Sequence, residues 1–129
     1  MGQQQMLFII LGAIIVGIAI AVGITIFGSA SVSSNKDALV NELNNLATDA
    51  YQFRVRPSTL GGGGQSYAGY VVPGKLDTTD DGTFTPITPV STPNAINFVA
   101  TSVYGFGTIS VTLDKDGKLG SFTYSGDFQ

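Results

Sequence analysis

The side chains most able to do chemistry in this 129-residue chain are its aspartates, because the chain contains no histidine and no cysteine. It therefore lacks the commonest general base, the commonest metal ligand, a thiolate nucleophile and any disulfide. Asp114, Lys115, Asp116 and Gly117 begin like a calcium-binding loop, but an EF-hand needs Gly at its sixth position and Glu at its twelfth. Asp116-Gly117 is instead a strong hairpin signal, so these residues are predicted to form a turn.

Two further groups resemble ligand sites in composition. Asp77, Asp80 and Asp81 form a loose acidic cluster with the chemistry for calcium, although a solvated loop explains them more simply. The glycine run 61–64 is not a phosphate-binding loop, because no Lys-Ser or Lys-Thr follows it and it comes after a predicted helix. No residue is singled out as a nucleophile. We therefore expect no catalytic residues, no metal site, no cofactor and no enzyme activity.

The charged residues are few and unevenly placed. Six basic and nine acidic residues make up 12% of the chain, about half the ~25% usual in globular domains. None precedes Lys36, which excludes an ordinary soluble domain for the whole chain. The net charge of −3 also argues against a nucleic-acid partner, since neutralising phosphates needs clustered Lys and Arg.

Residues 7–27 form an uncharged apolar segment in which Thr25 is the only hydroxyl-bearing residue. As a helix it would be roughly 32 Å long, close to the ~30 Å hydrocarbon core of a bilayer. Because it is apolar on every side, lipid or protein must surround it. We assign residues 1–5 to a polar N-terminus or minimal leader, and residues 6–28 to a helix that spans a membrane or lies in a filament core. A secretory signal peptide is the alternative, but residues 1–5 carry no basic residue and the apolar run is too long.

Small residues recur along this segment at four-residue spacings. This spacing lets the backbones of two helices approach closely. The pairs point in more than one direction, which indicates several neighbouring helices. The candidate packing residues are Gly12, Ala13, Gly17, Ala19, Ala21 and Gly23.

We assign residues 29–56 to an amphipathic helix, whose periodicity is clear over residues 36–56. The apolar positions step by 4, 3, 4 and 3 residues, and polar residues fill the opposite face. This stripe is predicted to dock a folded head and consists of Leu39, Leu43, Leu46, Ala50 and Phe53. Pro57 should end the helix, and the glycine run 61–64 should be a flexible exit. Whether the polar, small residues 28–35 interrupt the helix is left open.

Residues 57–129 are predicted to form a β-rich head. Strand signals at 66–72, 82–87, 95–104, 107–113 and 119–124 predict an antiparallel sheet of three to five strands. Such a small sheet needs a cover on one face, and the helical stripe supplies it, which gives an α+β fold. Thr85, Thr88 and Thr92 each precede a proline in an exposed loop or edge strand. These threonines are candidates for O-linked sugar, with a plain exposed loop as the simpler interpretation.

This layout resembles that of type IV pilins and related filament subunits. The matching parts are the hydrophobic helix 6–27, its amphipathic extension 36–56 and the head 67–124. The resemblance implies cleavage by a prepilin peptidase between Gly2 and Gln3, followed by polymerisation with bundled N-terminal helices. In the family an acidic residue stands five positions after the cut, whereas this chain has Leu7 there.

The resemblance also implies partners and a location. The partners are copies of the same chain in a helical homopolymer and, before polymerisation, the cytoplasmic membrane and a pilus assembly machinery. The expected location is an extracellular surface filament serving adhesion or motility. Two alternatives remain: a single-pass membrane protein with a small extracytoplasmic binding domain, and a minor pseudopilin of a secretion or DNA-uptake machine.

Overall fold

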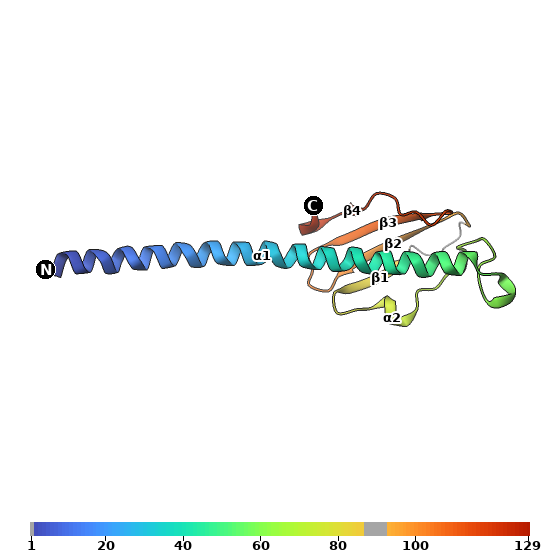
Figure 1. The fold of residues 1–129 in the computed structure, drawn as a ribbon, viewed down its shortest axis with the longest axis horizontal. Helices are drawn as coiled ribbons and strands as arrows, with labels where there is room; N and C mark the ends of the chain where they lie inside the picture. The colour runs from blue at the N-terminus through green and yellow to red at the C-terminus, as the bar shows by residue number, and fades with distance from the viewer. Residues whose placement is uncertain (1, 87–92) are drawn as a thin grey trace. The chain divides into compact units, whose positions relative to one another are not determined.

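The computed structural model describes residues 2–86 and 93–129. It confirms the α+β layout, with one long N-terminal helix followed by a small antiparallel sheet (Figure 1). The elements are α1 (Gly2–Val55), η1 (Ser58–Leu60), α2 (Gly74–Asp77), β1 (Gly82–Pro86), β2 (Ala95–Ser102), β3 (Thr108–Asp114), β4 (Thr123–Tyr124) and η2 (Gly126–Phe128). Contacts divide the chain into two compact units, Met1–Ser33 and Ser34–Gln129. We call the second of these the head unit; it contains the amphipathic part of α1.

Residues 28–35, where the sequence left a break open, are helical and belong to α1. The short hydroxyl side chains fold back onto the helix instead of competing with it. Ser31 Oγ donates to the Phe27 carbonyl oxygen at 3.0 Å, the bond to residue i−4 that serine makes inside helices. Further along, Asn35 is buried in the head unit, so tertiary contacts hold this poor helix former in place.

The C-terminal end of α1 is closed by the glycine run, which is not the flexible exit that the sequence predicts. The Gly63 amide donates to the Phe53 carbonyl oxygen at 2.8 Å and the Gln65 amide to that of Arg54 at 2.7 Å, so two of the helix's last carbonyls are satisfied. A Cβ atom at Gly62 would overlap Arg56, and one at Gly63 would overlap the Ser66 backbone. Glycine is required at positions 62 and 63 because neighbouring backbone atoms leave no space for a side chain.

The sheet has the order β1-β2-β3-β4, and every neighbouring pair is antiparallel. Phe98 in the central strand β2 lies opposite Val111 of β3, and both are buried, as the alternation of the strand residues requires. The predicted turn joins β3 to the segment that follows it: Asp114 Oδ1 accepts hydrogen bonds from the amides of Asp116 and Lys118. The predicted strand 119–124 is shorter than expected, since only Thr123–Tyr124 pairs as a strand.

The predicted strand at 66–72 is wrong, because this segment is irregular and is anchored by side chains. Tyr67 Oη donates to the Asp114 carbonyl oxygen at 2.6 Å, and Tyr70 Oη donates to Asp49 Oδ2 at 2.6 Å. Gly69 between them has φ of +83°, which breaks an extended backbone. Burial raises the pKa of Tyr67 to about 12 and also raises that of Tyr70.

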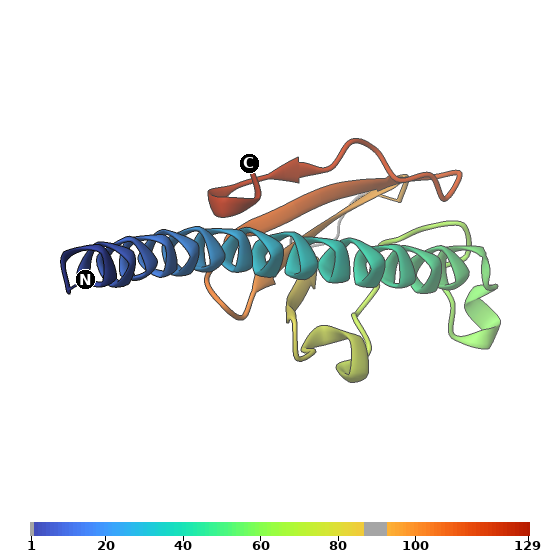
Figure 2. The same ribbon diagram turned by 60° about the vertical axis from the view of Figure 1, so that its left-hand side comes forward.

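The core of the head unit lies between the sheet and the amphipathic part of α1, which runs alongside the strands in both ribbon views (Figures 1 and 2). Phe53, at the end of the stripe, is partly buried and lies edge-on to Tyr70 with ring centroids 5.4 Å apart. The buried apolar residues come from both layers: Leu39, Leu43, Leu46, Ala47 and Ala50 from the helix, and Phe84, Ile96, Phe98, Ala100, Ile109, Val111 and Leu113 from the sheet.

Glu42 predicts a pH dependence of the stability of the head unit. Burial raises the pKa of the Glu42 carboxyl, and the negative charges of Asp81 and Asp80 raise it further. The Thr79 hydroxyl, which donates a hydrogen bond to Glu42 Oε2 at 2.9 Å, lowers this pKa and so offsets part of the rise. Because the folded-state pKa lies above the ordinary value of 4.5, the folded state binds this proton more tightly than the unfolded chain. The resulting stabilisation is complete below that value and is lost as the pH rises through the raised pKa.

We therefore expect Glu42→Gln to make the head unit more stable than wild type at neutral pH and equally stable below pH 4.5. The glutamine amide oxygen still accepts the Thr79 hydrogen bond, so the substitution removes the charge and keeps the contact. Urea unfolding at a series of pH values measures the difference. Wild-type and variant curves that stay parallel over the whole range would contradict this assignment.

Candidate functional site

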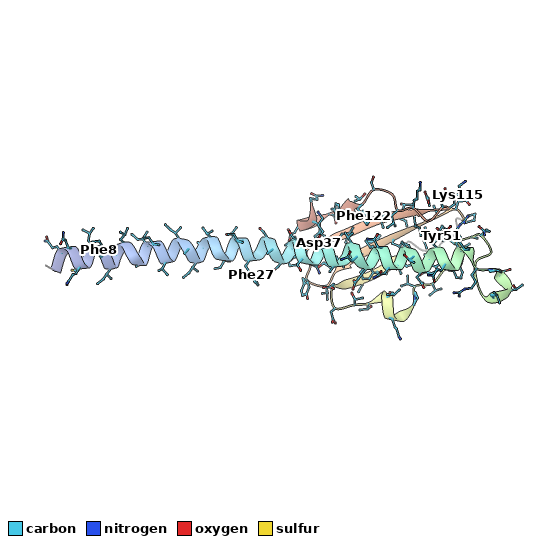
Figure 3. The ribbon with its side chains drawn as sticks, viewed as in Figure 1. Phe8, Phe27, Asp37, Tyr51, Lys115 and Phe122 are labelled. Carbon is cyan, nitrogen blue, oxygen red and sulfur yellow. The ribbon has the colours of Figure 1, made fainter. Side chains whose placement is uncertain are left out.

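The largest uncovered feature of the described residues is the apolar surface of α1. We call residues 6–27 the apolar stretch. Within the described part of the chain, α1 is the one helix long and apolar enough to span a membrane, and none of its most apolar window is buried. Phe8 and Phe27 project outward from the ribbon, and Phe27 is 75% exposed (Figure 3). The exposed large side chains are Met6, Leu7, Phe8, Ile9, Ile10, Leu11, Ile14, Ile15, Val16, Ile18, Ile20, Val22, Ile24, Ile26 and Phe27.

The apolar stretch leaves no side-chain polar group in need of water. Its one hydroxyl, Thr25 Oγ1, donates to the Ala21 carbonyl oxygen at 3.0 Å. The backbone groups are paired within the helix, as in any segment suited to an apolar environment. The surface is therefore compatible with lipid and with the apolar surface of another protein helix.

The glycines of α1 have no role in the fold of their own chain. A Cβ atom added to Gly12, Gly17, Gly23 or Gly28 meets nothing within 4 Å. Each glycine in a helix interior costs about 1 kcal/mol relative to alanine. The glycines of the head unit differ, since a Cβ at Gly82, for example, would lie 2.8 Å from Leu39 Cδ2. The glycines of α1 are therefore not required by contacts within the chain, and their lack of side chains leaves room for another helix.

The small residues form two stripes on different sides of α1. With about 100° of rotation per residue, Gly12, Ala19 and Gly23 fall within about 20° of one direction. Ala13, Gly17 and Ala21 fall around a second direction, roughly 140° away. We call these the first and second small-residue stripes. Each is a shallow groove that a neighbouring helix backbone can approach closely.

Gly2 and Gln3, the residues of the predicted cleavage, lie in the first turn of α1 and are exposed. No contact of the described residues bears on whether the bond between them is cut, so processing stays a prediction. Thr85 is exposed on the edge strand β1. Thr88 and Thr92, the other candidates for O-linked sugar, lie outside the described residues.

The acidic residues that were considered as calcium ligands include two with structural positions or contacts, Asp77 and Asp81. Residues 2–86 and 93–129 contain no group of three or more His, Cys, Asp or Glu that could hold a metal ion. Asp77 ends the short helix α2. The Asp81 carbonyl oxygen accepts hydrogen bonds from Asn35 Nδ2 at 3.1 Å and from the Val103 amide at 3.1 Å, so Asp81 links three segments through its backbone.

Sequence reasoning missed the buried polar contact made by Asn35. Its Oδ1 accepts a hydrogen bond from Ser102 Oγ at 2.8 Å, and both residues are buried. A signal was present, because Asn35 stands four residues before Leu39 and so continues the apolar stripe of the helix by one step. A polar residue on that line predicts a partner in the sheet.

Comparison with known proteins gives no match: no protein-family model, curated protein or solved structure resembles the chain closely enough to be matched. The functional inference therefore comes from the residues themselves. The relevant features are an apolar helix surface with nothing over it, two small-residue stripes, and a head unit whose own apolar stripe is already covered.

Proposed function

We propose that this chain is the structural, non-enzymatic subunit of an extracellular helical filament of the type IV pilus kind. The observation that supports this most is the set of helix glycines that touch nothing in their own chain. A membrane anchor needs length and apolarity, but it does not need close-approach positions. A subunit that packs helix against helix needs both.

Protein neighbours explain the glycines better than lipid alone does. Lipid tails are as apolar as leucine side chains, so burial of apolar surface does not by itself drive helices together in a membrane. Packing between close backbones does drive them together, and it requires small residues at the contact. Gly12, Gly17 and Gly23 supply such positions, and a close contact with a neighbouring copy would offset their cost to helix stability.

The two stripes favour a polymer over a dimer. A symmetric pair of helices uses one contact surface on each copy. The first and second small-residue stripes lie on different sides of one helix, so each copy can bind at least two neighbours. Contacts between unlike surfaces that do not close into a ring generate a helical filament.

The head unit is suited to remain outside such a helical bundle. Its stripe residues Leu39, Leu43 and Leu46 are already buried against the sheet, so they are not available to neighbours. The charges begin only at Lys36, so close stacking of the apolar stretch brings no like charges together. Before assembly, lipid would cover the same surface, and transfer from lipid to a helix bundle costs little hydrophobic free energy.

The proposal includes a location and partners. The unassembled subunit resides in the cytoplasmic membrane and meets an assembly machinery there, and the assembled subunit contacts copies of itself in an extracellular filament.

Shearing the surface of cells that express the chain tests the filament proposal. We expect the chain to be abundant in the sheared material, to form thin fibres in negative-stain microscopy, and to give one N-terminal sequence. Recovery only with membranes would instead identify a single-pass protein with a binding head. Low abundance at the membrane without long fibres would identify a minor pseudopilin.

A further inference from the structure

The head unit has exposed apolar side chains at both of its ends. At one end, the side chain of Asn35 holds the turn between β2 and β3, in which Val103 and Tyr104 are 59% and 62% exposed. At the other end, where α1 finishes, Val55 and Leu60 are 45% and 71% exposed. The amphipathic part of α1 separates the two ends by about 30 Å of helix, so the two apolar groups do not meet within one chain.

The end that carries the β2–β3 turn is acidic. The Asp81 carbonyl oxygen accepts a hydrogen bond from the Val103 amide at 3.1 Å, and the Asp127 amide donates one to the Phe106 carbonyl oxygen at 2.6 Å. Both aspartates therefore lie beside the turn, and Asp80 precedes Asp81 in the chain. The side chains of Asp80 and Asp127 are exposed. We define the turn face as Val103, Tyr104, Asp80, Asp81 and Asp127.

The end at which α1 finishes is basic. Arg56 directly follows α1, and Lys115 and Lys118 belong to the turn after β3. This turn lies against α1, because a Cβ atom at Gly117 would be 2.8 Å from Tyr51 Cδ2, and Tyr51 and Lys115 lie together at this end in Figure 3. Arg56, Lys115 and Lys118 are exposed, and none of them forms an ion pair with a residue among 2–86 and 93–129. We define the tip face as Val55, Leu60, Arg56, Lys115 and Lys118.

The other charges at the two ends do not cancel this difference. At the acidic end, Lys36 Nζ lies 4.0 Å from the centre of the Tyr124 ring. At the basic end, the Asp114 carboxylate already accepts hydrogen bonds from the amides of Asp116 and Lys118. Asp116 is exposed and offsets one of the three basic charges of the tip face. The turn face therefore keeps an excess of negative charge, and the tip face keeps an excess of positive charge.

The two faces are complementary in chemistry. Each has an exposed apolar centre with charged side chains around it, which is the composition of a protein interface. Three aspartates surround one centre and three basic residues surround the other, and opposite charges across a contact select the partner and fix its register. We propose that the turn face of one copy binds the tip face of the next copy, so that head units associate head to tail.

This contact rests on the proposed function and adds a second interface between subunits. It joins unlike faces, so each bound copy still presents one free face of each kind to a further copy. Contacts of this kind continue into an open polymer unless the rotation between copies closes a ring. The head units would thus contribute to polymerisation in addition to the apolar stretch.

Engineered cysteines test the contact, because the chain contains no cysteine. The full-length variant with Tyr104→Cys and Leu60→Cys, which we call the two-face variant, carries one thiol on each face. Its thiols are too far apart to join within one copy, so successive disulfides between copies give a ladder of multimers on a non-reducing gel. The matched control combines Leu60→Cys with Val71→Cys, at a 78% exposed site outside both faces. Membranes and sheared surface material from expressing cells are oxidised and compared.

We expect the two-face variant to give dimers, trimers and longer multimers, and the control to remain monomeric. Adding Lys115→Glu and Lys118→Glu to the two-face variant should reduce the multimers about fivefold, because attraction becomes repulsion. Adding Asp80→Lys and Asp127→Lys as well should restore them. Monomers in both fractions, or charge reversals without effect, would overturn the proposal. Dimers formed by Tyr104→Cys alone would overturn it too, since like faces would then be in contact.

The same samples separate this contact from the filament proposal. Fibres that form from the two-face variant without cross-links would overturn the head-to-tail contact and leave the filament proposal standing. Multimers in membranes from cells that form no fibres would support the contact and contradict the filament proposal.

Discussion

Replacing Gly17 with leucine should abolish filaments while leaving the subunit folded. Gly17 belongs to the second small-residue stripe, and a Cβ added there meets nothing within 4 Å of its own chain. Inside the subunit the substitution is favourable by about 1 kcal/mol, because leucine is the better helix former. Between subunits the leucine side chain fills the groove and separates the two helix backbones. Because the substitution should stabilise the helix of the single subunit but weaken packing between subunits, a loss of fibres cannot be attributed to a loss of helix stability.

The measurement is the amount of fibre in sheared surface material, together with the amount of subunit in the membrane. We expect a near-complete loss of fibres with normal membrane levels. Ile18→Leu is the control, since it changes a large exposed side chain of the same helix, outside both stripes, without changing its volume. Gly17→Ala should lie between Gly17→Leu and wild type. Wild-type quantities of fibre from Gly17→Leu would show that the stripe does not mediate assembly.

Truncating Leu43 to alanine should destabilise the head unit by about 2–5 kcal/mol. Leu43 is fully buried at the centre of the stripe against the sheet, and its removal leaves a cavity as well as losing apolar burial. Domains of this size are stable by only about 5–15 kcal/mol, so the loss is a large part of the total. The substitution tests whether the helix supplies the cover that the sheet requires.

Leu60→Ala is the matched control, because Leu60 is the same residue type at an exposed site and should change stability by less than about 0.5 kcal/mol. Denaturant unfolding of the full chain in detergent micelles, followed by the near-ultraviolet circular dichroism of the tyrosines, measures both variants. Equal midpoints for Leu43→Ala and Leu60→Ala would mean that the sheet folds without the helix.

The layout of the fold was predictable because its two helical patterns are long and regular. The charge-free run and the spacing of Leu39, Leu43 and Leu46 each extend over several turns, so chance is a poor explanation for them. Strands β1 to β3 were predictable from alternation. The prediction of a strand at 66–72 was wrong, because Tyr67 and Tyr70 are held by hydrogen bonds from their hydroxyls to Asp114 and Asp49 and not by strand pairing. No local sequence pattern encodes such distant partners.

The candidate site likewise has one part that the sequence predicts and one part that only the structure shows. The small-residue stripes could be identified from spacing alone, since helix geometry converts spacing directly into direction. What the sequence could not show is that the helix glycines lack contacts whereas Gly62, Gly63 and Gly82 are required by the fold, because that difference depends on tertiary neighbours. The buried polar contact of Asn35 was hidden for the same reason. Its side chain bonds to the Asp81 carbonyl oxygen and to Ser102 Oγ, which are 46 and 67 positions away in the sequence.

The filament proposal is tested most directly by electron cryomicroscopy of fibres sheared from cells that express the chain. We predict a helical fibre of this one chain, with the apolar stretches bundled along its axis and the head units on its outer surface. In the density, Gly12, Gly17 and Gly23 should lie where helix backbones of neighbouring copies approach most closely. Fibres in which the apolar stretches do not touch one another, or sheared material that lacks this chain, would contradict the proposal.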